Sequence, residues 1–278
     1  MSDGYDPTGV SHDPDAFAGW LRLREAADAA ARAADLLEPL RRPPTGGGPT
    51  VVHDLGAGTG SMVRWLAPRL PGPQHWVLYD RDPVLLRRAH PRLAAADGAP
   101  VTVATRRADI TRLTAADLAG ASLVTASALL DMLTAEEIER VVAACAGRPT
   151  LFTLSVVGRV ELTPPHPLDD EVAKAFNDHQ RRTVAGRTLL GPDAPEACVA
   201  AFARHGVAAT VRPSPWRLGP EQAALAAEWF AGWLDAAREQ RPELAGPAEA
   251  YGRRRLAQAR AGQLGVLVDH RDLLAGCP

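Results

Sequence analysis

Three glycines at alternate positions, Gly56, Gly58 and Gly60, follow an apolar run in the segment VVHDLGAGTGSMVRWL. A bare backbone directly after a strand lets a ligand approach closely, and a phosphate group is the familiar ligand of such a loop. A dinucleotide-binding loop has the spacing G-x-G-x-x-G, which requires a glycine where this chain has Ser61. Asp54 stands at the end of the run, and its carboxylate disfavours pyrophosphate and favours an ammonium group or another cationic ligand.

Two further acidic residues follow later apolar runs. Asp80 ends the segment HWVLYD, and Asp109 follows the segment PVTVATRR. A carboxylate has two acceptor oxygens, so it can accept hydrogen bonds from both hydroxyls of a vicinal diol. In a parallel sheet, ligands bind beyond the carboxyl ends of the strands, which is where these residues are expected.

The elements that must position these residues alternate between strands and helices. Strands are predicted at TVVHDLG, HWVLYD, PVTVATRRADI, ASLVTAS and TLFTLSV, and helices at SMVRWLAPRL, VLLRRAHPRL and TAEEIERVVAAC. Asp82 before Pro83 predicts one helix start, and a capping box of Thr134 and Glu137 predicts another. Pro91 should end the second of these helices early. The alternation predicts an α/β fold with a doubly wound (Rossmann-like), mostly parallel seven-stranded sheet and helical lid insertions.

The remaining chain divides into segments around this core. Residues 1–48 are expected to form an N-terminal helical lid and a linker, and residues 49–158 the core that binds the ligand. Residues 159–278 are expected to complete the sheet within the same domain. Lid insertions are expected at about 159–190 and 220–262, because helical segments there are too long for ordinary crossovers.

Composition narrows the classes of partner. The chain has 278 residues, 46% of them hydrophobic, and a formal net charge of −2, so it has no overall field that attracts nucleic acid. No stretch of about 20 apolar residues is present, and the N-terminus lacks the apolar core of a signal peptide. Three scattered cysteines without metal-type spacing indicate reduced thiols in the cytoplasm and no metal site. The expected partner is a small-molecule substrate rather than nucleic acid or a membrane, and the oligomeric state stays open.

The sequence Asp54-Leu-Gly-Ala-Gly-Thr-Gly60 resembles motif I of the class I S-adenosylmethionine-dependent methyltransferases. The resemblance covers about residues 50–155, and it implies S-adenosyl-L-methionine as the cofactor. It implies that Asp80 binds both ribose hydroxyls and that Asp109 lies near the adenine amino group. The segment SLVTASALLDML would lie near the methionine part and the methyl group. The cofactor-binding residues so implied are Asp54, Gly56, Ala57, Gly58, Gly60, Asp80, Arg81, Asp109, Ile110, Ser127 and Ala128.

The catalytic candidates are less well marked. Asp131 lies four residues after Ser127 and near the expected methyl group, so it is the first candidate for a general base, with a turn or cap residue as the alternative. His166 and His179 are weaker candidates for the same role. A base is needed when the acceptor carries a proton that must leave, whereas an ionised acceptor needs alignment alone.

Two helical stripes could contact the acceptor. Trp20, Arg24 and Asp28 recur at four-residue intervals near the N-terminus, and Asn177 and Arg181 share a helix face in the first insertion. The alternatives are core packing with a salt bridge for the first stripe and a solvated face for the second. The three arginines at 253–255 are expected on a solvated face.

The predicted function is methyl transfer from S-adenosylmethionine to a small molecule, on oxygen or nitrogen, with carbon as a further option. Arginines around the lid slightly favour an anionic or carboxylated acceptor. Two alternatives stay open: an NAD(P)-dependent oxidoreductase, which the glycine spacing disfavours, and a non-catalytic S-adenosylmethionine-binding protein.

Overall fold

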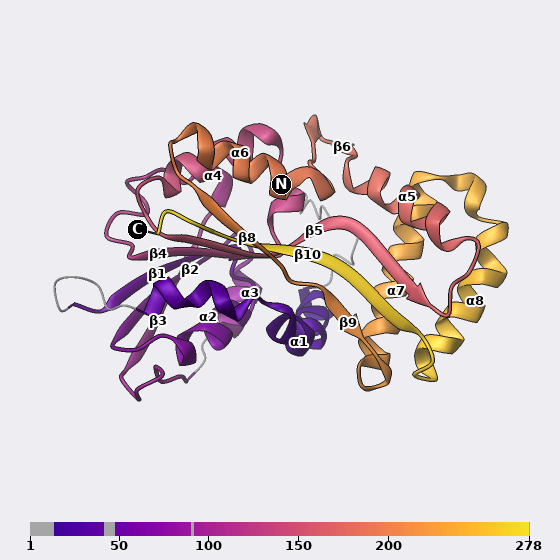
Figure 1. Ribbon diagram of the computed structural model, residues 1–278, viewed down its shortest axis with the longest axis horizontal. Helices are drawn as coiled ribbons and strands as arrows, with labels where there is room; N and C mark the ends of the chain where they lie inside the picture. The colour runs from indigo at the N-terminus through magenta and orange to yellow at the C-terminus, as the bar shows by residue number, and fades with distance from the viewer. Residues whose placement is uncertain (1–13, 42–47, 90–91, 278) are drawn as a thin grey trace.

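The computed structural model describes residues 14–41, 48–89 and 92–277. Its main sheet has the strands β1 (Thr50–Leu55), β2 (Gln74–Asp80), β3 (Val101–Arg107), β4 (Leu123–Ser127), β5 (Thr150–Thr163), β8 (Ala209–Pro213), β9 (Trp216–Leu218) and β10 (Gly265–Ala275). The strand order is β3-β2-β1-β4-β5-β10-β8, and β9 pairs with β10 (Figure 1). Strands β1 to β5 are parallel, whereas β10 runs antiparallel to its neighbours. The doubly wound, mostly parallel seven-stranded sheet is confirmed, and β9 joins it as a short eighth strand.

The helices are α1 (Pro14–Ala31), α2 (Ser61–Leu66), α3 (Pro83–Arg88), α4 (Ala135–Cys145), α5 (Asp169–Gln180), α6 (Ala194–Arg204), α7 (Ala223–Gln240) and α8 (Pro247–Arg260). The short strands β6 (Thr183–Val184) and β7 (Arg187–Thr188) form a separate hairpin. Both predicted helix starts are confirmed: Asp82 accepts from the Val84 N–H, and Thr134 with Glu137 completes the capping box of α4. The predicted role of Pro91 lies outside the described residues.

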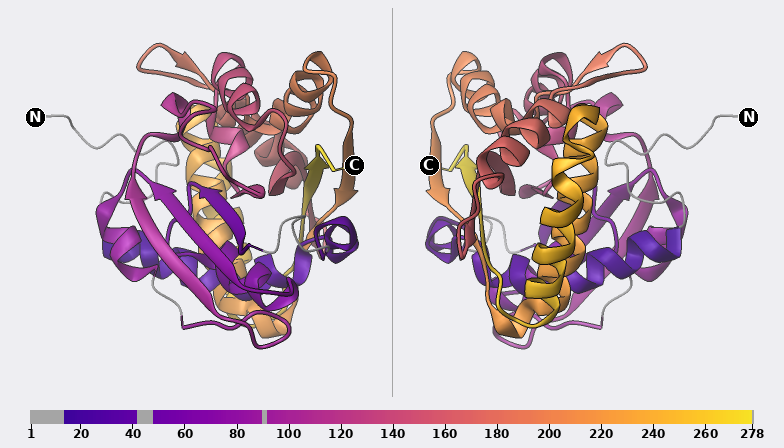
Figure 2. Two further views of the ribbon diagram at one scale, coloured as in Figure 1. Left: turned by 90° about the vertical axis from the view of Figure 1, so that its left-hand side faces the viewer. Right: turned by 90° about the vertical axis from the view of Figure 1, so that its right-hand side faces the viewer.

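The two faces of the core sheet are covered by different helices. Helices α4 and α6 pack on one face, and α2 and α3 lie on the other (Figure 1). Figure 2 shows the same arrangement from the two ends of the view in Figure 1. Parallel strands covered on both faces are buried throughout, which explains the nearly continuous apolar runs of β1, β2 and β4.

Strands β5 and β10 extend well beyond the core sheet. They pair from Thr150 opposite Ala275 to Thr163 opposite Gly265. The extended part carries β9 and supports a helical lobe of α5, α7 and α8, with Trp216 and Phe230 in its apolar core. This lobe, on the right of Figure 1, includes most of the two segments expected to be lids.

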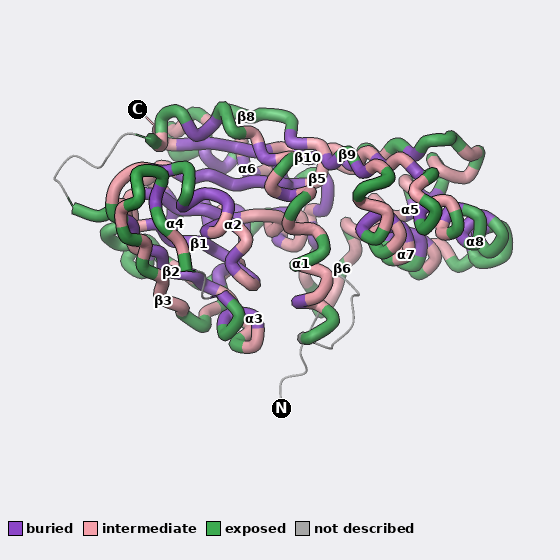
Figure 3. The backbone as a smooth tube through the Cα atoms, turned by 90° about the horizontal axis from the view of Figure 1, so that it is seen from below, coloured by how far each residue is buried: buried purple, intermediate pink, exposed green. Residues whose placement is uncertain are grey.

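Helix α1 lies under the extended strands and packs against the edge of this lobe through Trp20, Ala27 and Ala31. It contacts β9, α3 and α7, and Figure 3 shows it between α3 and the helical lobe. The chain then continues through a 3-10 turn at Ala34–Arg41. None of the helices in the described part of the chain is long and apolar enough to cross a bilayer.

Candidate active site

The glycine loop between β1 and α2 needs its glycines. Gly56, Gly58 and Gly60 all have positive φ, at 67°, 54° and 83°, a region that residues with a Cβ enter at a cost. A Cβ on Gly58 would lie 3.1 Å from Cδ1 of Leu21, and one on Gly56 would lie 3.0 Å from Cδ1 of Leu129. The loop is therefore enclosed by α1 on one side and by the segment after β4 on the other.

Asp80 holds this loop from the end of β2. One carboxylate oxygen accepts from the Gly58 N–H at 2.8 Å, and the other accepts from the Asp82 N–H at 2.9 Å. Burial raises the pKa of Asp80, although both backbone N–H groups oppose the rise. Each oxygen retains a lone pair, so the carboxylate can still accept from a diol. Arg81, the next residue, is exposed.

Asp54 has one satisfied and one unsatisfied oxygen at the end of β1. Its Oδ1 accepts from Thr125 Oγ1 at 2.7 Å, whereas its buried Oδ2 has no hydrogen-bond partner in the described structure. Burial raises the pKa of Asp54 to about 7, against the hydrogen bond from Thr125 and the charge of Arg32. A cationic group at this oxygen would stabilise the carboxylate.

Arg32, at the end of α1, was missed by the sequence analysis. Its Nη2 donates to Ser127 Oγ at 3.0 Å and reaches Ser61 Oγ at 3.5 Å, and its guanidinium lies over the ring of Trp65. Burial lowers its pKa, and its buried Nη1 has no hydrogen-bond partner in the described structure. The available signal was the stripe of Trp20, Arg24 and Asp28, because one further step of four residues reaches Arg32.

Asp54 Oδ2 and Arg32 Nη1 are buried atoms without a hydrogen-bond partner in the described structure, and together they suit the amino-acid part of S-adenosylmethionine. A carboxylate oxygen and a guanidinium nitrogen, close enough for each to shift the other's pKa, complement the ammonium and carboxylate of an amino acid. Asp80 offers acceptors for a ribose diol, and the glycine loop allows close backbone approach. The residues present therefore fit the cofactor that the sequence implies.

One face of α1 covers this region. Arg24 Nε donates to both oxygens of Asp28, at 2.9 and 3.2 Å, and Asp28 accepts from Trp216 Nε1 at 3.0 Å. The Arg24 guanidinium lies 4.8 Å from the ring centroid of Trp216 and 5.8 Å from that of Trp20. The stripe thus does form a salt bridge and aromatic contacts. Its face continues from Leu21, above the glycine loop, to Arg32 at the end of β4.

The segment after β4 forms the remaining side of the candidate site. Ala128 has φ of 51°, and its N–H donates to Thr153 O at 2.9 Å, so the chain turns sharply after Ser127. Asp131 lies in the following 3-10 turn, where burial raises its pKa and the charge of Arg24 opposes the rise. The structure therefore brings Asp131 close enough to Arg24 for an electrostatic interaction.

The segment after β3 is more exposed. Asp109 accepts from the Thr111 N–H at 3.0 Å and from Thr111 Oγ1 at 2.7 Å, and it pairs with Arg112. Ile110 packs into the core. Asp109 thus caps a short turn in this structure, and its contact with adenine stays a prediction.

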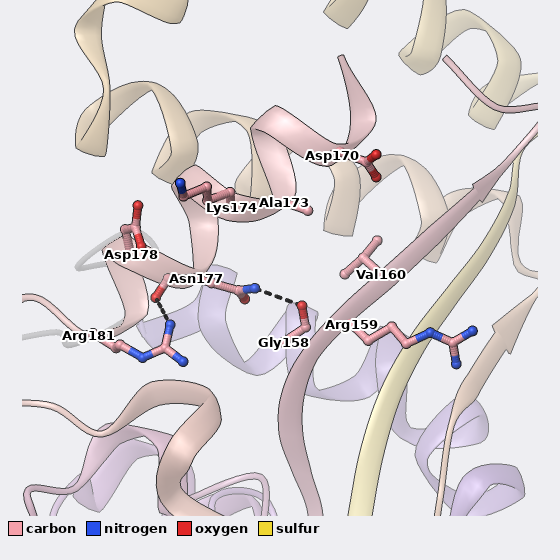
Figure 4. Close-up of a pocket in the computed structure, with 9 residues that line it drawn as sticks. All are labelled: Gly158, Arg159, Val160, Asp170, Ala173, Lys174, Asn177, Asp178 and Arg181. Atoms are coloured by element: carbon pink, nitrogen blue, oxygen red, sulfur yellow. Dashed lines mark hydrogen bonds between the residues drawn. The ribbon is translucent and has the colours of Figure 1, made fainter. Parts of the chain in front are cut away.

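The candidates on the first insertion lie elsewhere. Asn177 Nδ2 donates to Gly158 O at 2.7 Å (Figure 4). Arg181 pairs with Asp193. With residues of β5 and α5 they line an open pocket of about 540 Å³. Its lining residues do not include the glycine loop or Asp131.

The two histidines also belong to the helical lobe. His166 Nδ1 accepts from the Leu168 N–H, and its ring packs against Tyr251. His179 is buried, and its Nε2 lies 3.3 Å from a carboxylate oxygen of Glu239. Burial and Arg182 lower the pKa of His179.

The arginine run 253–255 requires a correction. Arg253 and Arg254 are exposed as expected, but Arg255 is 1% exposed and its Nη2 donates to both oxygens of Asp169. The expectation of a solvated face was wrong for Arg255, because a carboxylate 86 residues away in the chain compensates its charge.

Comparisons with known proteins identify a methyltransferase domain in the core of the chain. A family model described as a methyltransferase domain matches residues 52–148, and a search of curated proteins finds no match. Among solved structures, a cyclopropane-fatty-acyl-phospholipid synthase-like protein from Lactobacillus casei is 14% identical. It has a TM-score of 0.51, and the match covers 92% of each chain, which shows a shared fold.

Two further solved structures are more distant in shape. Magnesium protoporphyrin IX methyltransferase from Synechocystis PCC 6803 is 16% identical with a TM-score of 0.45, over 76% of this chain and 93% of that one. A methyltransferase from Geobacter sulfurreducens is 18% identical with a TM-score of 0.38, over 91% and 96%. The domain match covers the segment that carries the glycine loop, Asp80 and Asp131. The chain therefore carries a methyltransferase domain at residues 52–148, consistent with its resemblance to the class I S-adenosylmethionine-dependent methyltransferases.

Proposed function

We propose that the protein methylates a small molecule, on an oxygen or nitrogen atom, in a site beneath α1. The observation that carries the proposal is the attachment of α1 across the cofactor loop. Leu21 lies against Gly58, and Arg32 donates to Ser127. Glu25 of α1 also accepts from Arg64 of α2 at 2.7 Å. A substrate chain of protein or nucleic acid would need an open cleft, whereas a small acceptor can bind under this cover.

The cofactor residues have separate roles in this proposal. Asp80 binds the ribose hydroxyls, while Asp54 and Arg32 bind the ammonium and carboxylate of the methionine part. Gly58 allows the backbone to approach the ligand. S-adenosylmethionine, when bound, supplies a methyl group made electrophilic by its sulfonium. Because all four residues lie at the carboxyl ends of β1, β2 and β4 or directly above them, they hold the reacting end towards Ser127.

Asp131 has the role of general base. A lone pair of the acceptor forms the new bond to the methyl carbon, the carbon–sulfur electrons return to sulfur, and the acceptor proton passes to Asp131. A raised pKa suits this role, because a base works best when its pKa approaches the working pH. We prefer Asp131 to His166 and His179, because those two contact α7 or α8.

We place the reaction in the cytoplasm, without a nucleic-acid or membrane partner. Cys145 and Cys198 are buried free thiols, and Cys277 is a partly exposed one. Free thiols suit a reducing compartment. The net charge of −2 provides no general attraction to a phosphate backbone.

Methyl-labelled S-adenosylmethionine and a fractionated cell extract test the choice of acceptor. With the purified protein, label should enter the fraction of small molecules. Label retained on protein or nucleic acid after removal of small molecules would contradict the proposal. The variant Gly58→Val, which should abolish cofactor binding, is the negative control.

Asp131→Asn then tests the base. This change keeps the shape of the side chain and removes its charge, so kcat should fall by about 10²–10⁴-fold. Affinity for S-adenosylhomocysteine should stay within about twofold, as calorimetry can show. Glu136→Gln, an exposed acidic residue five positions later, is the matched control and should retain kcat. A twofold loss in Asp131→Asn would identify Asp131 as a turn residue.

A further inference from the structure

We infer that the acceptor carries a carboxylate group and that Arg24 binds it. This inference rests on the proposed function and adds a substrate class to it. Three features of Arg24 support it: its free hydrogen-bond donors, its position between the cofactor loop and Asp131, and the charges around it.

Arg24 is held firmly but has donors to spare. Its Nε donates to Asp28, and its guanidinium packs against the rings of Trp20 and Trp216. In the described part of the chain, its two terminal nitrogens make no hydrogen bond. The side chain is 15% exposed, so a ligand can reach it. A planar fork of four unused N–H groups matches the two oxygens of a carboxylate.

The position of Arg24 follows from its neighbours on the same helix face. Leu21, about one turn earlier, lies against Gly58, and Arg32, two turns later, donates to Ser127. Arg24 lies between these two fixed points, above the region where the methyl donor is proposed to bind. Its charge also opposes the rise that burial causes in the pKa of the Asp131 carboxyl, and the two residues form no ion pair in the described structure. An acceptor could therefore contact Arg24 at one end and Asp131 at the other.

The surrounding charges favour a carboxylate over a phosphate. Asp28 lies within 3.2 Å of the guanidinium and neutralises part of its charge, and Asp131 adds a second acidic group. Asp28 already compensates the charge of Arg24, so a bound anion gains from the free N–H groups rather than from net positive charge. A singly charged carboxylate would meet less repulsion from Asp28 and Asp131 than a doubly charged phosphate would. His270, whose ring packs on Trp216, adds no cation, because burial and Arg24 lower its pKa to about 3.

Binding of matched probes tests the inference. Affinities are measured by calorimetry at saturating S-adenosylhomocysteine for 4-hydroxybenzoate, 4-hydroxybenzamide and 4-hydroxyphenyl phosphate. The pair 3-hydroxybutyrate and 3-hydroxybutyramide tests an aliphatic frame. In each frame the acid should bind about 10- to 100-fold more tightly than the amide, the range for hydrogen bonds between charged groups. The phosphate should bind more weakly than the benzoate.

Variants assign the effect to Arg24. In Arg24→Gln the preference for acid over amide should disappear, and in Arg24→Lys part of it should return, because an ammonium keeps the charge without the fork. Arg22→Gln changes an exposed arginine on the same helix and should keep the full preference. Affinity for S-adenosylhomocysteine should change less than threefold in all three variants.

Each other outcome overturns the inference. Equal affinity of acid and amide in the wild-type protein, or no binding of either acid at millimolar concentration, shows that the site does not select a carboxylate. If 4-hydroxyphenyl phosphate binds more tightly than 4-hydroxybenzoate, the site selects a phosphate rather than a carboxylate. If Arg24→Gln weakens S-adenosylhomocysteine as much as the acids, Arg24 belongs to the cofactor site. If the wild-type protein does not bind S-adenosylhomocysteine, the proposed function itself fails.

Discussion

Replacement of Asp80 by alanine should weaken cofactor binding while the protein stays folded. Asp80 accepts one backbone N–H on each oxygen, from Gly58 at 2.8 Å and from Asp82 at 2.9 Å. The remaining lone pairs are the ones that we assign to the ribose hydroxyls. Truncation removes these acceptors and also releases the Gly58 N–H that shapes the loop.

The expected magnitude follows from these bonds. Hydrogen bonds to a charged group contribute about 1.5–3 kcal/mol, so the loss corresponds to roughly tenfold to a hundredfold weaker binding of S-adenosylhomocysteine. The release of two backbone N–H groups should also lower the free energy of unfolding by about 1–3 kcal/mol. Asp80→Asn should have a smaller effect on binding, because its side chain keeps one acceptor oxygen.

Calorimetric titration with S-adenosylhomocysteine measures the affinity, and circular dichroism confirms the fold. The matched control is Asp82→Ala in the same loop, which removes the cap of α3. It should cost about 1 kcal/mol of stability and leave the affinity unchanged. A folded Asp80→Ala protein that binds within twofold of wild type would refute the role of this carboxylate.

Two further predictions concern the same strand ends. Gly58→Val should abolish S-adenosylhomocysteine binding while the circular dichroism spectrum is retained, because φ of 54° and the contact with Leu21 leave no room for a branched Cβ; normal binding would show that the loop does not cradle the ligand. Asp54→Asn tests the raised pKa of about 7. Since the folded state disfavours ionisation, wild-type stability relative to this variant should fall by several kcal/mol between pH 4 and pH 8, at most about 1.4 kcal/mol per pH unit. Urea unfolding at several pH values measures the difference, and a difference independent of pH would contradict the assigned burial.

Local signals predicted the core of the fold well. The helix caps formed by Asp82 and by Thr134 with Glu137 join residues two or three positions apart. They could therefore be predicted from the local sequence. The alternation of apolar runs with helices was enough to predict the doubly wound sheet. The extension of β5 past Gly158 was not predicted, because residues 159–163 were assigned to a lid insertion. Their side chains alternate between exposed and buried or partly buried, which is the pattern of a half-buried strand.

Contacts between distant segments were the main omission. Arg32 is surrounded by small residues in the sequence, and its importance depends on Ser127 and Thr153, 95 and 121 residues away. Arg255 likewise depends on Asp169. Asn177 and Arg181 share a helix face as expected, but that face lines a pocket against β5 rather than the glycine loop. The spacing of residues on a helix predicts which side chains share a face, but it does not predict which other segment that face contacts.

A crystal structure of the complex with S-adenosylhomocysteine tests the central claim most directly. We expect the ribose hydroxyls on Asp80, the amino-acid part between Asp54 and Arg32, and the sulfur facing Asp131 beneath α1. Electron density that places the sulfur at an open surface, away from α1 and Asp131, would contradict the proposed enclosed site for a small-molecule acceptor.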